Sequence, residues 1–184
     1  MNPIRLLMSV ALLLPATAWG QQPNFPNGRT TPAYQVNLPD GAVYVRLDTV
    51  STWVLAPGDR KTVFRATVDV FKALKIQTDI MDSLRTEVGN LGLVESRTFA
   101  GQRMSTWLRC GESMTGPNAD SWRIYMAVVS GVEGVNNDSS KVRTLITATA
   151  RNMAGSSNPI RCTTTGRFEM MLGKRIAETL AKGS

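Results

Sequence analysis

Two segments decide the fold class of this chain: Ser121–Val132 (SWRIYMAVVSGV) and Lys141–Asn152 (KVRTLITATARN). Both are rich in β-branched residues, and apolar side chains recur at every second position, which is the period of a β-strand. The alternating sets are Trp122, Ile124, Met126 and Val128 in the first segment, and Val142, Thr144, Ile146 and Ala148 in the second. The pattern predicts two long antiparallel strands, with a hairpin connection at Gly131–Ser140.

Two helices are predicted, one before and one after the part of the chain that contains these two strands. Asp59 follows a Pro-Gly turn and is the expected N-cap of a helix that continues to about Lys75. The second helix is expected at Arg167–Lys182, because apolar residues recur there at every fourth position. Those residues are Phe168, Leu172, Ile176 and Leu180.

Shorter strands are predicted at 42–47, 52–55, 76–81, 91–97 and 159–164. Runs of strands between helices favour an α+β fold, here a curved antiparallel β-sheet with two main helices packed on one face. This order resembles that of helix-grip domains over residues 42–182. The resemblance implies a fold and no particular activity. We expect 42–184 to form a single domain.

The first 20 residues predict an export signal that is cleaved before Gln21. Arg5 supplies a positive charge, Leu6–Leu14 is a short apolar run, and Ala18 and Gly20 are small residues at the positions read by a signal peptidase. An uncleaved membrane anchor is the alternative, but the apolar run is shorter than the ~20 residues that span a bilayer. We therefore expect an exported protein, with the periplasm as its preferred location.

Residues 21–41 are rich in proline and asparagine and are predicted to form an extended arm. Such an arm is either a mobile leader or a strap that becomes ordered on a partner. Phe25 and Tyr34 would anchor the strap.

Cys110 and Cys162 are the chain's two cysteines. In an oxidising compartment they are predicted to form a structural disulfide. A reactive thiol pair is the alternative, but the two residues lack the C-x-x-C spacing of a redox site.

The composition argues against several kinds of chemistry. The chain has no histidine, which excludes imidazole general bases and triads that need one. No phosphate-binding loop or nucleophile-elbow motif occurs. Asp79, Asp82 and Glu87 could still act as paired carboxylates. We expect no catalytic residues, no cofactor and no metal site.

Arginine is over-represented: beyond residue 20 the chain has 14 arginines and six lysines. Because they are spread along the predicted strands, they form either an ordinary solvent-exposed face or a basic face for an acidic protein or anionic lipid. We expect no nucleic-acid partner. The segment 103–111 mixes arginines with Trp107 and a cysteine. The predicted interaction surface comprises Phe25, Tyr34, Arg103, Trp107 and Arg109.

These observations favour a non-catalytic interaction domain, acting as an accessory or extrinsic subunit of an envelope or membrane protein complex. One alternative is a carrier that holds a small apolar ligand between the sheet and the C-terminal helix, lined by Trp53, Trp107 and Trp122. A second alternative is a carboxylate-dependent hydrolase.

Overall fold

The two long predicted strands form the centre of the main sheet in a computed structural model, which describes residues 33–50, 52–154 and 158–182. They are β11 (Arg123–Asn136) and β12 (Ser139–Arg151), and they pair antiparallel along their whole length. The predicted ten-residue connection is wrong, because the strands continue to a turn at Asn137 and Asp138. Gly131 and Gly134 do not end β11.

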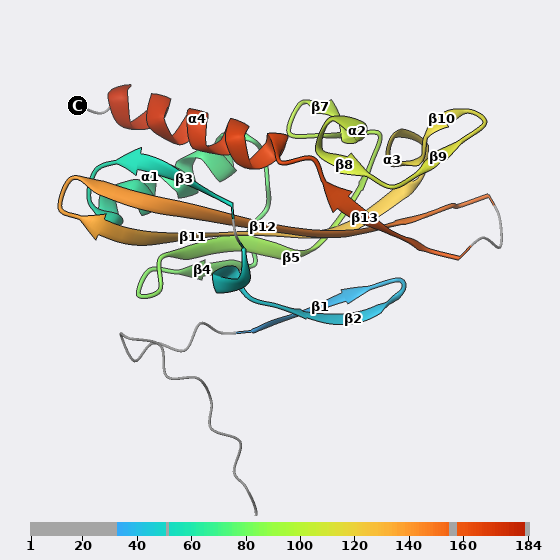
Figure 1. Ribbon diagram of the computed structural model, residues 1–184, viewed down its shortest axis with the longest axis horizontal. Coiled ribbons are helices and arrows are strands. Elements are labelled where there is room, and N and C mark those ends of the chain that lie inside the picture. The colour runs from blue at the N-terminus through green and yellow to red at the C-terminus, as the bar shows by residue number, and fades with distance from the viewer. Residues whose placement is uncertain (1–32, 51, 155–157, 183–184) are drawn as a thin grey trace, which may run out of the picture. The chain divides into compact units, whose positions relative to one another are not determined.

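The main sheet is built around this hairpin, and its strand pairs are all antiparallel (Figure 1). Its order is β4 (Ile80–Asp82), β5 (Glu87–Ser96), β11, β12, β13 (Ile160–Thr164) and β8 (Leu108–Arg109). A further strand, β3 (Trp53–Pro57), pairs with the beginning of β12, whereas β13 pairs with the end of β12. The architecture is therefore α+β with a mostly antiparallel sheet, as predicted.

Two long helices cover one face of the sheet: α1 (Arg60–Ala73) and α4 (Arg167–Lys182) (Figure 1). The predicted N-cap of α1 is confirmed, since the Asp59 carboxylate accepts hydrogen bonds from the backbone N–H groups of Lys61 and Thr62 at 2.9 and 3.2 Å. Both helices place their apolar sides against the inward set of β11. The resulting core includes Phe71, Phe168, Leu172, Ile176, Ile124, Met126 and Val128.

Gly173 allows α4 to approach β3 closely. A Cβ atom built at this position would lie 2.5 Å from Cγ1 of Val54, a distance that real side chains do not tolerate. The absence of a side chain at Gly173 therefore sets the spacing between the terminal helix and the sheet.

The opposite face of the sheet is covered by a second hairpin, β1 (Tyr34–Leu38) and β2 (Gly41–Val45), followed by the 3-10 turn η1 (Leu47–Thr49) (Figure 1). Val36 and Leu38 pack on Ala127. Leu47 packs on Val129 and Leu145. The sheet is therefore buried on both faces over its central part. This explains why β11 is apolar at consecutive positions, where a half-exposed strand would alternate.

The predicted arm overlaps this hairpin. Residues 21–32, like the predicted signal at 1–20, lie outside the described residues. Residues 34–41 form β1, its turn and the first residue of β2, so this part of the segment belongs to the folded unit.

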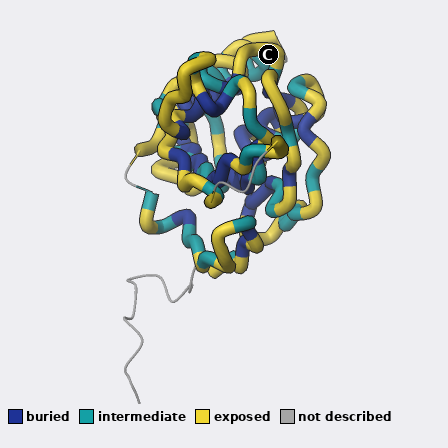
Figure 2. The backbone as a smooth tube through the Cα atoms, turned by 90° about the vertical axis from the view of Figure 1, so that its right-hand side faces the viewer, coloured by how far each residue is buried: buried dark blue, intermediate teal, exposed yellow. Residues whose placement is uncertain are grey.

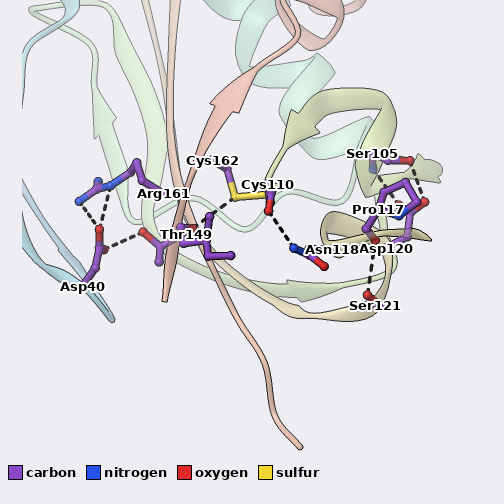
Figure 3. Close-up of a disulfide and its surroundings, with 11 residues drawn as sticks. Asp40, Ser105, Cys110, Pro117, Asn118, Asp120, Ser121, Thr149, Arg161 and Cys162 are labelled. Carbon is purple, nitrogen blue, oxygen red and sulfur yellow. Dashed lines mark hydrogen bonds and ion pairs between the residues drawn. A yellow bond between two sulfur atoms is a disulfide. The ribbon is translucent and has the colours of Figure 1, made fainter. Parts of the chain in front are cut away.

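Residues 97–122 carry short elements outside the main sheet, in addition to β8: β6 (Thr98–Phe99), β7 (Gln102–Arg103), α2 (Met104–Trp107), β9 (Glu112–Ser113), β10 (Gly116–Pro117) and α3 (Asn118–Ser121). The predicted disulfide is confirmed, with Cys110 bonded to Cys162 (Figure 3). The bond fastens this segment to β13.

Viewed from its end, the unit shows buried positions on the inner sides of its layers and exposed positions outside (Figure 2). Among the described residues, no helix is both long and apolar enough to cross a membrane.

Candidate interaction surface

The most unusual feature of the sheet is an arginine pair at the end of its central hairpin. Arg123 begins β11, Arg151 ends β12, and the two residues are directly opposite in the register. Both are exposed. They share the face that carries the β1–β2 hairpin, because Tyr125, two residues from Arg123, packs in the cluster under that hairpin. Like charges directly opposite each other weaken strand pairing, so the pair has an energetic cost.

Three further exposed arginines, Arg97, Arg103 and Arg109, belong to the segment between β5 and β11. This segment packs on the helix-covered side, because Phe99, Met104 and Trp107 join the core around Phe168. We therefore call Arg123 and Arg151 alone the arginine surface.

None of these five side chains has an ion-pair partner within the described ranges. Two acids near the arginine pair in the chain, Glu95 and Asp120, face other parts of the fold. Glu95 shares the helix-covered face with its register partner Ile124, and burial raises the pKa of its carboxyl. Asp120 accepts hydrogen bonds from the backbone N–H and the hydroxyl of Ser105, at 2.8 and 2.7 Å. The arginine surface is therefore positive with no neutralising carboxylate of this chain among the residues described.

An apolar strip borders the arginine pair. Val94 on β5 is the register partner of Tyr125, so both side chains lie on the same face as Arg123. Val94 is 51% exposed, whereas Tyr125 is half-buried against the hairpin. The surface thus offers guanidinium groups beside an exposed apolar side chain.

The structure separates the residues of the predicted interaction surface. Arg103 and Arg109 are exposed on β7 and β8, in the segment between β5 and β11, and are separate from the Arg123–Arg151 pair. Tyr34 is half-buried in β1, and its hydroxyl donates a hydrogen bond to Glu87. Burial and this bond raise the pKa of Tyr34 well above its ordinary value. Phe25 lies outside the described residues.

Trp107 is a core residue, which corrects its expected place on the surface. It is 5% exposed, and its Nε1 donates a hydrogen bond of 2.8 Å to the backbone carbonyl of Phe99. Its ring meets that of Phe168 edge-on, with 5.7 Å between centroids. The short helix α2 turns Trp107 inward, a direction that a segment without clear periodicity does not reveal.

Sequence reasoning missed Arg123 and Arg151 as a pair. With a two-residue turn at Asn137 and Asp138, counting back along both strands places Arg123 opposite Asn152. A bulge between Gly134 and Asn136 shifts the register by one residue and brings Arg123 opposite Arg151, and no local pattern in the sequence marks that bulge. A ten-residue connection leaves that register undetermined.

The three carboxylates considered for hydrolysis each have structural partners. Asp82 and Glu87 are register partners in β4 and β5. Nη2 of Arg85 lies 2.8 Å from Oδ2 of Asp82, and Nε of Arg85 lies 3.5 Å from Oε2 of Glu87. A hydrogen bond from the backbone N–H of Arg85 contributes most to holding the pKa of Asp82 below its usual value. Asp79 accepts a hydrogen bond from the backbone N–H of Leu91 at 3.1 Å.

The tryptophans considered for a ligand cavity lie in three different places. Trp53 is exposed on β3, where the Nζ of Lys141 lies 4.8 Å from its ring centroid. Trp107 is in the core, and Trp122 is partly buried against it. Between α4 and the sheet, Phe168, Leu172 and Ile176 are fully buried in the main cluster.

No group of three or more acidic or cysteine side chains in the described part of the chain is placed to hold a metal ion. In comparisons with known proteins, no family model matches the chain and no curated protein matches it. Its class is therefore defined by its own architecture: an α+β domain with a disulfide, a sheet covered on both faces and an exposed arginine surface.

Proposed function

We propose that the protein is a non-catalytic protein-binding domain that docks an acidic partner on the arginine surface. The observation that carries the proposal is the placement of Arg123 directly opposite Arg151 with no ion pair to either within the residues described. Such an arrangement costs strand-pairing energy in the free protein. An acidic partner offsets that cost and gains charge-assisted hydrogen bonds.

The proposal includes export to the periplasm and a role as an accessory subunit of an envelope or membrane protein complex. The Cys110–Cys162 disulfide is compatible with an oxidising compartment. Residues 1–20 have the composition of an export signal. We also retain the curved, helix-grip-like form of the sheet as part of this proposal, in which the sheet wraps around α4.

The proposal assigns no catalysis to the chain. The absence of histidine removes the commonest general base. The carboxylates Asp82 and Glu87 are bound by Arg85, and Glu87 also accepts the hydroxyl of Tyr34. These contacts support a role in fastening the β1–β2 hairpin and the β4–β5 turn.

Partner capture with matched charge reversals tests the proposal. The full chain carries an affinity tag in its native cells, and the envelope is solubilised in mild detergent after cross-linking. The site variant is Arg123→Glu/Arg151→Glu, and the control is Arg65→Glu/Arg175→Glu, which changes exposed arginines on α1 and α4. Thermal unfolding monitored by circular dichroism establishes that both variants are folded.

We expect a protein recovered in stoichiometric amount with the wild type and the control. Its recovery with the site variant should fall at least about tenfold, the equivalent of one strong charged contact. Equal recovery with the site variant contradicts the assignment of the surface. Failure to recover any partner from cross-linked envelopes contradicts the protein-binding function.

A further inference from the structure

We infer that the partner presents an extended segment to Arg123 and Arg151, in which a carboxylate and an apolar side chain stand two residues apart and face the same side. This inference rests on the proposed protein-binding function and names the chemistry of the bound segment.

Both cations of the arginine surface are arginines, although lysine is present elsewhere in the chain. A guanidinium group presents a planar fork of N–H donors that matches the two oxygens of a carboxylate. The Cβ atoms of directly opposed residues in antiparallel strands are about 5 Å apart. Arg123 and Arg151 can therefore hold one carboxylate from both sides or two carboxylates side by side.

The same face already binds a carboxylate within the chain. Oδ2 of Asp40, in the turn between β1 and β2, accepts a hydrogen bond of 2.9 Å from Nε of Arg161 and lies 2.7 Å from Nη2 of the same guanidinium in an ion pair (Figure 3). Its other oxygen accepts the hydroxyl of Thr149 at 2.7 Å. Thr149 lies on β12 two residues before Arg151 and therefore on the same face. This contact shows how a carboxylate is held here, by a forked guanidinium on one strand and a side chain on the next.

The exposed apolar residue beside the arginine pair favours a segment whose acidic and apolar residues are two positions apart. Val94 lies on β5, two residues before Ser96, the register partner of Arg123. Successive side chains of an extended segment are about 3.4 Å apart along the chain and point to opposite sides, so residues two positions apart face the same side. When an acidic residue contacts Arg123, the residue two positions away therefore faces the part of the surface that carries Val94.

The exposed aromatic residues argue against an anionic membrane as the ligand. Surfaces that bind membranes combine basic residues with aromatic side chains at the interface. Trp53 is opposite Arg143, eight residues along β12 from Arg151, and Tyr44 lies on the β1–β2 hairpin with its hydroxyl bonded to Gln35. Trp53 is therefore far from the arginine pair along the sheet, and Tyr125, the aromatic residue next to the pair, is half-buried under the β1–β2 hairpin.

Fluorescence anisotropy with labelled peptides tests the inference. One peptide repeats Glu-Ser-Val-Ser, which places glutamate and valine two positions apart on one side of an extended chain, and its control has glutamine in place of glutamate. Each is titrated with the purified exported chain at an ionic strength of about 0.15 M, where long-range attraction is screened. The protein variants are Arg123→Gln/Arg151→Gln and the matched control Arg65→Gln/Arg175→Gln. Vesicles of phosphatidylglycerol in phosphatidylcholine serve as the membrane probe.

The glutamate peptide should bind the wild type and the control equally, and should bind the site variant at least about tenfold more weakly. Equal binding of the glutamine peptide, undiminished binding by the site variant, or binding of vesicles in place of the peptide overturns the inference. If partner capture depends on Arg123 and Arg151 while the glutamate peptide does not bind, this inference fails and the protein-binding function stands. If the peptide binds and no partner is captured, the protein-binding function fails.

Discussion

Asp40 and Arg161 are 121 residues apart in the chain and form an ion pair. Oδ2 of Asp40 lies 2.9 Å from Nε and 2.7 Å from Nη2 of Arg161. The next residue, Cys162, is bonded to Cys110. Because neighbouring residues of a strand point to opposite faces, β13 holds the β1–β2 hairpin on one face and the segment 97–122 from the other (Figure 3). A short strand thus connects the two additions that flank the arginine surface.

Asp40→Asn should loosen the β1–β2 hairpin while leaving the rest of the fold intact. The substitution removes the charge from a partly exposed pair, so we expect a loss of up to about 1 kcal/mol in the free energy of unfolding. Hydrogen exchange should increase mainly at backbone amides of β1 and β2. Increased exchange of equal size throughout β11 and β12 would contradict a local role.

The deficit of Asp40→Asn should depend on pH. Burial raises the pKa of Asp40, but hydrogen bonds from Thr149 and its own backbone N–H, together with Arg161, outweigh this effect and lower the pKa below its ordinary value. The ionised carboxylate therefore adds stability above the unfolded pKa of about 4, and this contribution is lost as pH falls through the lower folded pKa. Urea unfolding should show the full deficit at about pH 6 and almost none at about pH 2. A deficit that grows on acidification would contradict this linkage.

Reduction of the disulfide should destabilise the chain strongly. The bond closes a loop between residues separated by 52 positions. In the chain-entropy model such a loop is worth about 4 kcal/mol, a large part of the stability of a typical domain. Urea unfolding of the Cys110→Ser/Cys162→Ser variant should show a loss of that order, with the unreduced wild type as reference. A change within error would mean that the reduced chain retains the same restraint.

Gly173→Ala should move α4 away from β3. The added Cβ would lie 2.5 Å from Val54 Cγ1, so we expect a loss of about 1–3 kcal/mol from overpacking. Gly92→Ala is the control, because nothing lies within 4 Å of a Cβ at that position. In thermal unfolding, the double variant Gly173→Ala/Val54→Ala should recover part of the stability lost by Gly173→Ala, because the shorter side chain at position 54 leaves room for the added Cβ. If the single variant is as stable as the control, the contact between α4 and β3 is looser than described.

Trp107→Phe should lower the free energy of unfolding more than Trp53→Phe does. Trp107 is buried and bonded to the Phe99 carbonyl, so the smaller ring leaves a cavity and an unpaired acceptor, at a cost of about 2–4 kcal/mol. Trp53 is 45% exposed and makes only a cation–π contact with Lys141 among its ring contacts in the described structure. Equal losses in guanidinium unfolding would contradict the assignment of Trp107 to the core.

The sequence predicts the elements better than it predicts what covers them. The α4 bounds, the Asp59 cap and the disulfide follow from local patterns, because capping, periodicity and cysteine pairing depend on nearby residue types or on compartment. The cover of β11 by the β1–β2 hairpin does not follow, because it depends on contacts between Val36 and Ala127 that are far apart in the chain. A proline-rich segment also gives little sign that part of it forms a strand.

The candidate site was not predicted, for the same reason. Arg103 and Arg109 were identified from local composition and are separate from the Arg123–Arg151 pair, whose opposition requires the hairpin register. Trp107 was placed on the surface because an aromatic residue between arginines looks exposed when its direction is unknown. The direction is set by α2 and by the Phe168 ring, which neighbours it only in the folded unit.

Photo-cross-linking in intact cells tests the central claim most directly. A benzophenone amino acid replaces Val94 beside the arginine surface, or Met170 on the exposed side of α4, in the full tagged chain. The two positions are similarly exposed, at 51% and 59%. We predict a discrete cross-linked protein from position 94 that disappears with Arg123→Glu/Arg151→Glu, and no such product from position 170. The same product from both positions, or a product from position 94 that survives the charge reversal, would contradict binding at the arginine surface.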